Sequence, residues 1–136
     1  MNLGIEAEIK AFTSIYSEKV LATRTRRIEL LGRKCDPQII KGFLGYELKL
    51  QRRRITCPDM VTARYLRVFA KLGAAAIEIP YNPAETASIV PELEDQLQRI
   101  EQLNQEGADS PEIRRERATR LFRRIRARLK AIELQD

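Results

Sequence analysis

The stretch PQIIKGFLGYELKL, residues 37–50, places apolar side chains at the spacing of an α-helix. Its apolar positions recur at intervals of four, three and four residues: Ile39, Phe43, Tyr46 and Leu50. Side chains three and four residues apart lie on one face of a helix, so the spacing predicts an amphipathic helix. Further aliphatic residues widen its apolar arc, and we therefore expect this helix at the centre of the fold.

The segments on either side show the same spacing. One apolar stripe runs through residues 5–31 and stops at Gly32, and another runs through residues 61–72 and stops at Gly73. A glycine just past the last apolar position is typical of a helix end. Both patterns therefore predict amphipathic helices, the first of them long.

Proline marks the starts of the predicted helices. Its missing N–H costs nothing at the first helical position, and a polar residue before it can cap the helix. A polar or thiol residue precedes proline at four junctions: Asp36-Pro37, Cys57-Pro58, Asn82-Pro83 and Ser110-Pro111. These junctions divide the chain into five helical segments.

Between residues 74 and 81 the spacing changes from helical to alternating. Ile77 and Ile79 flank Glu78, and Pro80 prevents a helix from continuing beyond it. The pattern predicts a short extended segment, and a prolongation of the preceding helix is the alternative. A lone strand leaves its backbone groups unpaired, so it would need a strand from a second copy or remain a linker.

Residues 83–136 are predicted to form an antiparallel helical hairpin. An apolar stripe ends at Gly107, and Ser110 begins the last helix three residues later. The last helix carries a heptad-like apolar seam, which we expect to bind a second copy of the chain or another partner. The seam contains Phe122, Ile125, Leu129 and Ile132.

These segments predict an all-α fold, a bundle of about five helices with one short extended segment near residues 74–81. A chain of 136 residues buries enough surface for a single domain without metal or disulfide support. Within residues 1–136 we distinguish a basic helical core, residues 1–82, from the hairpin of residues 83–136. We assign oligomerisation to the hairpin and expect a homodimer.

Charge is sorted along the chain into three blocks. Lys and Arg against Asp and Glu number 15 and 7 in residues 1–71, 1 and 8 in residues 72–109, and 9 and 4 in residues 110–136. The blocks carry +8, −7 and +5, which give the chain its net charge of +6. A basic block binds an external polyanion only where the acidic block does not neutralise it within the fold.

The N-terminal basic block is the candidate nucleic-acid surface. Arg outnumbers Lys by 18 to 7, and its planar guanidinium matches phosphate oxygens in a bidentate geometry. Residues 39–72 also have the outline of a helix-turn-helix, with Arg64 and Arg67 where base contacts are made. The candidate contacts are Arg24, Arg26, Arg27, Arg52, Arg53, Arg54, Arg64, Arg67 and Lys71.

Each basic cluster also has a purely structural explanation. Arg52–Arg54 would favour the negative end of a helix dipole, and the stripe from Arg64 to Lys71 would be the solvated face of its helix. The arginines of the last helix would pair with the acidic helix before it. Carboxylates from the middle of the chain lying against Arg52–Arg54 and Arg64 would therefore remove the candidate surface.

The sequence contains no constellation typical of an enzyme. Histidine is absent, and no Gly-rich phosphate loop or paired-cysteine motif occurs. Cys35 and Cys57 lie 22 residues apart without histidine partners, which predicts neither a zinc site nor a disulfide. We expect a protein without catalytic activity, cofactor or metal. Without an apolar run long enough for a signal peptide or membrane span, we expect it in the cytoplasm.

Two functions fit these expectations. The first is a non-enzymatic nucleic-acid-binding protein, with DNA and RNA both open. The alternative is a scaffold, adaptor or assembly factor whose basic face docks an acidic protein. The segment TARYLRVFAKLGAAAIEI, residues 62–79, resembles the helical region that follows the wing in MerR-type regulators. Their winged recognition motif is not present upstream, and we do not assign the chain to that family.

Overall fold

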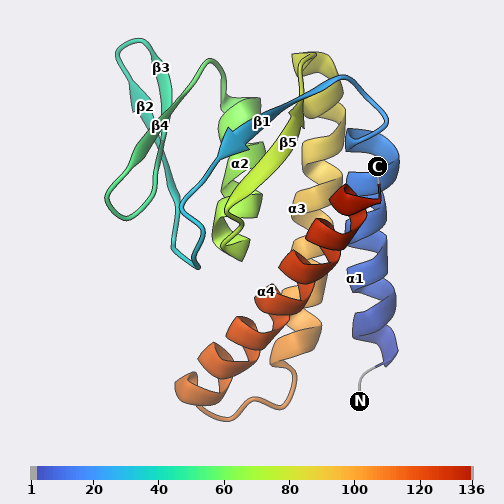
Figure 1. Ribbon diagram of the computed structural model, residues 1–136. Helices are drawn as coiled ribbons and strands as arrows, with labels where there is room; N and C mark the ends of the chain where they lie inside the picture. Colours follow the sequence, from blue (N-terminus) through green and yellow to red (C-terminus); the bar gives the residue numbers. More distant parts are fainter. Residues whose placement is uncertain (1–2, 136) are drawn as a thin grey trace.

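The computed structural model describes residues 3–135 and has an α+β fold (Figure 1). The helices are α1 (Leu3–Ile15), which continues into a π-helical segment (Tyr16–Val20), α2 (Met60–Leu72), α3 (Pro83–Gln105) and α4 (Pro111–Leu134). The strands are β1 (Thr25–Glu29), β2 (Gln38–Gly42), β3 (Gly45–Lys49), β4 (Arg54–Cys57) and β5 (Ala76–Pro80). The prediction of an all-α helical bundle is therefore wrong.

Residues 37–50 form a β-hairpin instead of the predicted central helix. β2 pairs antiparallel with β3, and Gly42 lies opposite Gly45 at the turn. Leu48 and Leu50 are buried, whereas the charged residues that alternate with them are not, which is the pattern of a strand. A glycine inside a helix costs roughly 1 kcal/mol relative to alanine, so the two glycines also disfavour the helix.

β4 completes a small antiparallel sheet in the order β2-β3-β4. Asp59 then begins α2, because its carboxylate accepts a hydrogen bond from the N–H of Thr62 at 2.7 Å. α2 lies between this sheet and α3 (Figure 1). Because strands precede α2, the predicted helix-turn-helix does not form.

The extended segment predicted near residues 74–81 is confirmed as β5, and its partner strand lies in the same chain. β5 pairs antiparallel with β1, with Thr25 opposite Pro80 and Glu29 opposite Ala76. The first helix is therefore shorter than predicted, since β1 occupies part of its stretch. This pairing satisfies the backbone groups of β5 without a second copy.

α1, α3 and α4 form a helical layer beside the two sheets (Figure 1). α1 packs along α3 and contacts α4, and α3 and α4 form the predicted hairpin. Two predicted helix starts are confirmed, because Asn82 accepts a hydrogen bond from Ala84 N and Ser110 accepts one from Ile113 N. The junction Asp36-Pro37 precedes β2 and starts no helix.

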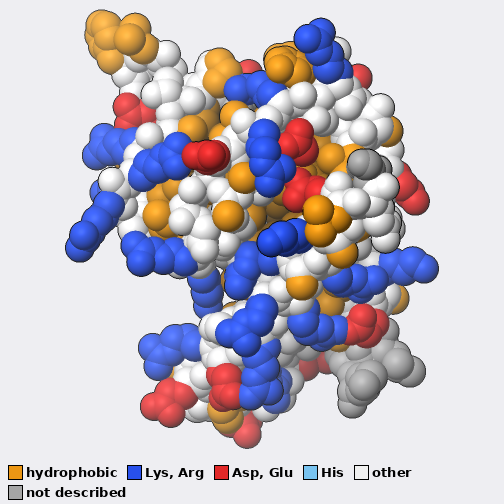
Figure 2. Space-filling view, viewed as in Figure 1, with side chains coloured by type: hydrophobic (Ala, Val, Ile, Leu, Met, Phe, Trp, Pro, Cys, Tyr) orange, Lys and Arg blue, Asp and Glu red, His pale blue; other side chains and the backbone are white. Residues whose placement is uncertain are grey.

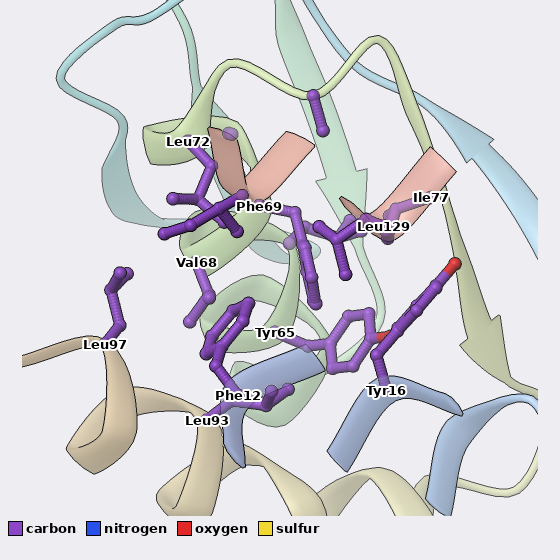
Figure 3. Packing of buried hydrophobic residues seen from close by; sticks show 14 of the residues in the cluster. Phe12, Tyr16, Tyr65, Val68, Phe69, Leu72, Ile77, Leu93, Leu97 and Leu129 are labelled. Atoms are coloured by element: carbon purple, nitrogen blue, oxygen red, sulfur yellow. The ribbon is translucent and has the colours of Figure 1, made fainter. Parts of the chain in front are cut away.

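A single hydrophobic core connects the layers, as Figure 3 shows. The ring of Phe69 on α2 lies 6.0 Å from that of Phe12, 5.7 Å from that of Tyr16 and 5.0 Å from that of Tyr65, measured between centroids. Leu93 of α3 packs against the same cluster. Aromatic pairs at these separations add to the stability gained from burial.

The apolar seam of α4 also lies within this core. Phe122, Ile125 and Leu129 are buried, and Ile132 is half-buried. The chain therefore covers with its own residues the seam that we expected to bind a partner. Any contact between copies has to use another surface.

Candidate nucleic-acid interface

The basic stripe of α2 faces α3 and is neutralised there. Arg64 and Arg67 both pair with Glu94, and Nε of Arg64 lies 3.1 Å from Oε2 of that carboxylate. Nζ of Lys71 lies 3.0 Å from Oε1 of Glu101. The hydrogen bond to Glu94 raises the pKa of Arg64, so this guanidinium stays charged and paired. Carboxylates from the acidic block thus occupy three of the candidate contacts.

The arginines of β1 and the residue before it do not gather in one cluster. Arg27 bridges Glu78 at 3.0 Å and Glu133 at 3.1 Å. Arg24 lies over the ring of Tyr81, 4.8 Å from its centroid. Arg26 points to the opposite face of the strand from Arg27, as neighbours in a strand do. These three side chains therefore have three different surroundings.

Arg52–Arg54 lie in and just after the turn between β3 and β4, not at a helix end. The explanation of these residues by a helix dipole is therefore removed. Arg54 pairs with Glu47 at 3.2 Å, and Arg53 donates to the carbonyl oxygen of Leu30 at 3.4 Å. Arg52 is exposed, and it has no carboxylate partner among the residues that the structure describes.

Most of the cations nevertheless remain unpaired. Nine of the 25 Lys and Arg side chains form ion pairs within residues 3–135, so 25 − 9 leaves 16 without a carboxylate there. On α4, Arg124 and Arg128 pair with Glu6 of α1, and Arg120 pairs with Glu116. Within the described chain no arginine of α4 pairs with a carboxylate of α3, contrary to the expected neutralisation, because the paired carboxylates of α3 face α2 and Lys19.

Eight cations without a carboxylate partner in the described chain lie on the loop after β1, the end of β3 and the turn that follows it, and one stripe of α4. We call this surface the basic face: Arg33, Lys34, Lys49, Arg52, Arg53, Arg123, Arg126 and Lys130. Figure 2 shows Lys and Arg side chains gathered over the small sheet and along α4. Of the candidate contacts predicted from the sequence, this surface contains Arg52 and Arg53.

The backbone at Gly73 lies close to two parts of the basic face, the loop of residues 33–34 and α4. A Cβ atom at Gly73 would lie 2.7 Å from the backbone nitrogen of Lys34 and 3.0 Å from a guanidinium nitrogen of Arg126. Arg126 also donates to the carbonyl oxygen of Leu72 at 2.6 Å. Nζ of Lys34 lies 5.4 Å from the ring centroid of Phe122. The loop of residues 33–34 therefore lies directly against α4.

A hollow of about 300 Å³ opens beside this contact, between α4 and the turn before β5. Gly32, Arg126 and Lys130 line it together with residues 73–77. Glu133 also lines the hollow, and its carboxylate is held by Arg27. The residues that line the hollow therefore carry a net positive charge.

The other candidate chemistry has no support in the described part of the chain. No group of His, Cys, Asp and Glu there could hold a metal ion. Burial raises the pKa of both Cys57 and Cys35, so neither thiol is set up as a nucleophile. None of the helices within residues 3–135 is long and apolar enough to cross a bilayer.

Comparison of the chain with protein-family models, with curated proteins and with solved structures found no match. The function of this protein therefore has to be inferred from its own geometry and charge.

Proposed function

We propose that this protein binds nucleic acid through the basic face and acts without catalysis. One observation carries the proposal. The eight cations of the basic face have no carboxylate partner within residues 3–135, and contacts at Gly73 hold the loop of residues 33–34 against α4. Neighbouring unpaired cations repel one another, and a phosphate backbone relieves that repulsion while releasing its own counterions.

The proposed contacts are with the phosphate backbone and not with base edges. α2, which the sequence favoured as the base-reading helix, is turned towards α3 by the pairs of Arg64 and Lys71. The basic face consists of a loop, the end of β3 with the turn after it, and the side of a helix whose apolar residues pack into the core. Phosphate contacts carry no sequence information, so we expect little sequence preference.

Salt dependence tests this proposal. The affinity for a labelled duplex and a labelled single strand is measured by fluorescence anisotropy over a series of salt concentrations. Each phosphate neutralised on a duplex contributes about −0.9 to the slope of log K against log salt, so eight cations set a limit of about −7. Absence of binding at the lowest salt concentration would contradict the proposal.

Two matched double variants locate the binding surface. Arg52→Glu with Arg53→Glu changes the basic face, and Arg114→Glu with Arg115→Glu makes the same charge change at the exposed start of α4. We expect the first variant to lower affinity by about tenfold or more and to reduce the salt slope by about 2. Equal losses in both variants would show attraction to net charge alone.

The second candidate is an adaptor or assembly factor whose basic face docks an acidic protein. One observation favours it, since Phe43 and Leu44 are fully exposed at a turn, and exposed apolar patches often mark protein contacts. Absence of nucleic-acid binding at low salt, together with a nuclease-resistant complex that Arg52→Glu and Arg53→Glu abolish, would select this candidate.

A further inference from the structure

Phe43 and Leu44 form an apolar tip on the β2–β3 hairpin, with exposed fractions of 102% and 90%. Two-residue hairpin turns favour glycine, asparagine and aspartate, so the turn does not require two bulky apolar side chains. Gly45, with φ of 132°, provides the backbone freedom after the turn. Apolar residues placed side by side at so exposed a point indicate a contact surface.

The small sheet that carries the tip is basic. Residues 38–57 contain five Lys and Arg side chains and one carboxylate, Glu47, which pairs with Arg54. Lys41 directly precedes the turn, and neither Lys41 nor Lys49 has a carboxylate partner within residues 3–135. The same cations surround the tip of a second copy, so a tip-to-tip contact between copies is unfavourable. The tip therefore suits an anionic partner that also offers apolar surface.

β3 connects the tip to the basic face. It runs from Gly45, next to the tip, to Lys49, and Arg52 and Arg53 lie in the turn that follows. At about 3.4 Å per residue, its five residues span about 17 Å. In Figures 1 and 2 the end of the hairpin projects at one corner of the molecule, and Lys and Arg side chains lie over the small sheet in the same view. A nucleic-acid strand held by Arg52 and Arg53 can therefore extend along the sheet to the tip.

We propose that the tip stacks on unpaired bases of a single strand whose phosphates are held by the basic face. Phe43 provides the ring on which a base stacks, and Leu44 adds apolar surface beside it. This role of the tip rests on the proposed function and adds the form of nucleic acid that the protein prefers. Contact with the faces of bases, unlike contact with their edges, gives little preference among sequences.

The energies of stacking favour a single strand over a duplex. A base that stacks on an aromatic side chain contributes about 1–3 kcal/mol to binding. Separating stacked bases within a duplex costs roughly a few kcal/mol per step, which offsets that gain. Bases of a single strand are accessible at a smaller cost. We therefore expect the tip to strengthen binding to single strands and to leave binding to a duplex nearly unchanged.

The first experiment compares the affinities for a labelled single strand and for the same strand in a duplex, by fluorescence anisotropy. The tip variant is Phe43→Ser with Leu44→Ser, two exposed positions at which substitution should change the free energy of unfolding by less than about 0.5 kcal/mol. We expect it to bind the single strand about fivefold or more weakly and the duplex as the wild type does. Its salt slope should match that of the wild type, because no cation is removed.

The second experiment detects stacking directly. The sequence contains no tryptophan, so Phe43→Trp places a single fluorescent reporter at the tip. A base that stacks on the indole quenches its fluorescence. Ile113→Trp is the matched control, since Ile113 is also exposed but lies at the start of α4, away from the tip (Figure 1). We expect saturable quenching of Phe43→Trp by the single strand, weaker quenching by the duplex, and no quenching of Ile113→Trp by either.

Three results would overturn this role of the tip while leaving phosphate binding by the basic face intact. They are an unchanged affinity of the tip variant for the single strand, equal losses for the single strand and the duplex, and equal quenching of the two tryptophan variants. A nuclease-resistant protein complex that the tip variant abolishes, with nucleic-acid binding unchanged, would assign the tip to a protein partner instead. Absence of any nucleic-acid binding at low salt would overturn both proposals, so the two failures are distinguishable.

Discussion

At the scale of single residues, a partly buried hydrogen-bond network fixes the end of α4. The hydroxyl of Tyr16 donates to Oε2 of Glu133 at 2.9 Å and accepts the N–H of Glu78 at 3.0 Å. The hydroxyl of Tyr65 donates to the carbonyl oxygen of Glu78 at 2.5 Å. Arg27 pairs with both carboxylates. The network therefore joins α4, β5, β1 and α2 to the π-helical segment.

Replacing Tyr16 by Phe tests the contribution of this network. The change leaves the N–H of Glu78 without its partner, and an unsatisfied buried donor costs about 1–3 kcal/mol. We expect urea unfolding to show a loss of this size in the free energy of unfolding. Tyr46→Phe is the matched control, since the structure gives that hydroxyl no partner within residues 3–135, and it should change stability by less than about 0.5 kcal/mol.

The wild type and Tyr16→Phe also differ in how their stability depends on pH. Burial raises the pKa of Tyr16 above its ordinary value of 10.0, so the folded state keeps this phenol protonated. The unfolded chain releases that proton above about pH 10, and stability is lost there by up to about 1.4 kcal/mol per pH unit for each such group. The advantage of the wild type over Tyr16→Phe should therefore be full below pH 10 and shrink above it. A constant difference would show that Tyr16 ionises freely in the folded state.

At the scale of secondary-structure elements, what could be predicted depended on local signals. α3 and α4 begin at Asn82 and Ser110 as the sequence indicates, because a capping residue and its helix are neighbours in the chain. β5 shows in the alternation of Ile77 and Ile79. β1 carried no such signal, since the strand that stabilises it lies far along the sequence. In β2 and β3 the spacing of apolar residues suits both a helix and a strand. Gly42 and Gly45 favour the strands, because glycine destabilises a helix interior.

The candidate site shows the same limit. The sequence identifies which side chains are charged, but the carboxylate opposite Arg64 belongs to Glu94, 30 residues further on. Pairing at that distance depends on the packing of α2 against α3, which no local pattern reveals. Arg33 and Lys34 directly follow Gly32, which ends the predicted helix. Their position in a loop was the only local sign in the sequence that these two cations are exposed.

Gly73 provides a test of how one element positions the basic face. Gly73→Ala forces alanine into a backbone with φ of 82° and brings its Cβ to 2.7 Å from the nitrogen of Lys34. Gly107→Ala has a similar φ of 74° but meets no atom within 4 Å, so it is the matched control.

We expect Gly107→Ala to cost about 1–2 kcal/mol from the left-handed backbone alone. Gly73→Ala should cost about 1–3 kcal/mol more, because backbone atoms of the adjoining loop have to move. Gly73→Ala should also weaken nucleic-acid binding when the affinity is measured without denaturant, under conditions where the variant is folded. Chemical denaturation and anisotropy measure the two effects, and equal stability losses in the two variants would contradict the close contact at Gly73.

At the scale of the whole molecule, charge pairing is uneven. The acidic block has its ion pairs chiefly with α2 and Lys19, while the basic face and much of α4 keep cations without partners in the described chain. Exposed ion pairs contribute only about 0–1 kcal/mol each. The nine cations paired within residues 3–135 therefore add little to stability, while neighbouring cations of the basic face repel one another in the folded state.

This balance predicts that the protein becomes more stable as salt increases at low ionic strength. The screening length falls from about 30 Å at 0.01 M to about 10 Å at 0.1 M, which weakens repulsion across the basic face before it weakens close pairs. A gain of about 1 kcal/mol would raise the midpoint of thermal unfolding by roughly 2–6 °C for a domain of this size. Arg52→Gln with Arg53→Gln removes two of the repelling charges, so its midpoint should rise less. A midpoint that falls with salt would mean that the ion pairs outweigh the repulsion, and the basic face would then lack the unfavourable self-energy that a polyanion is proposed to relieve.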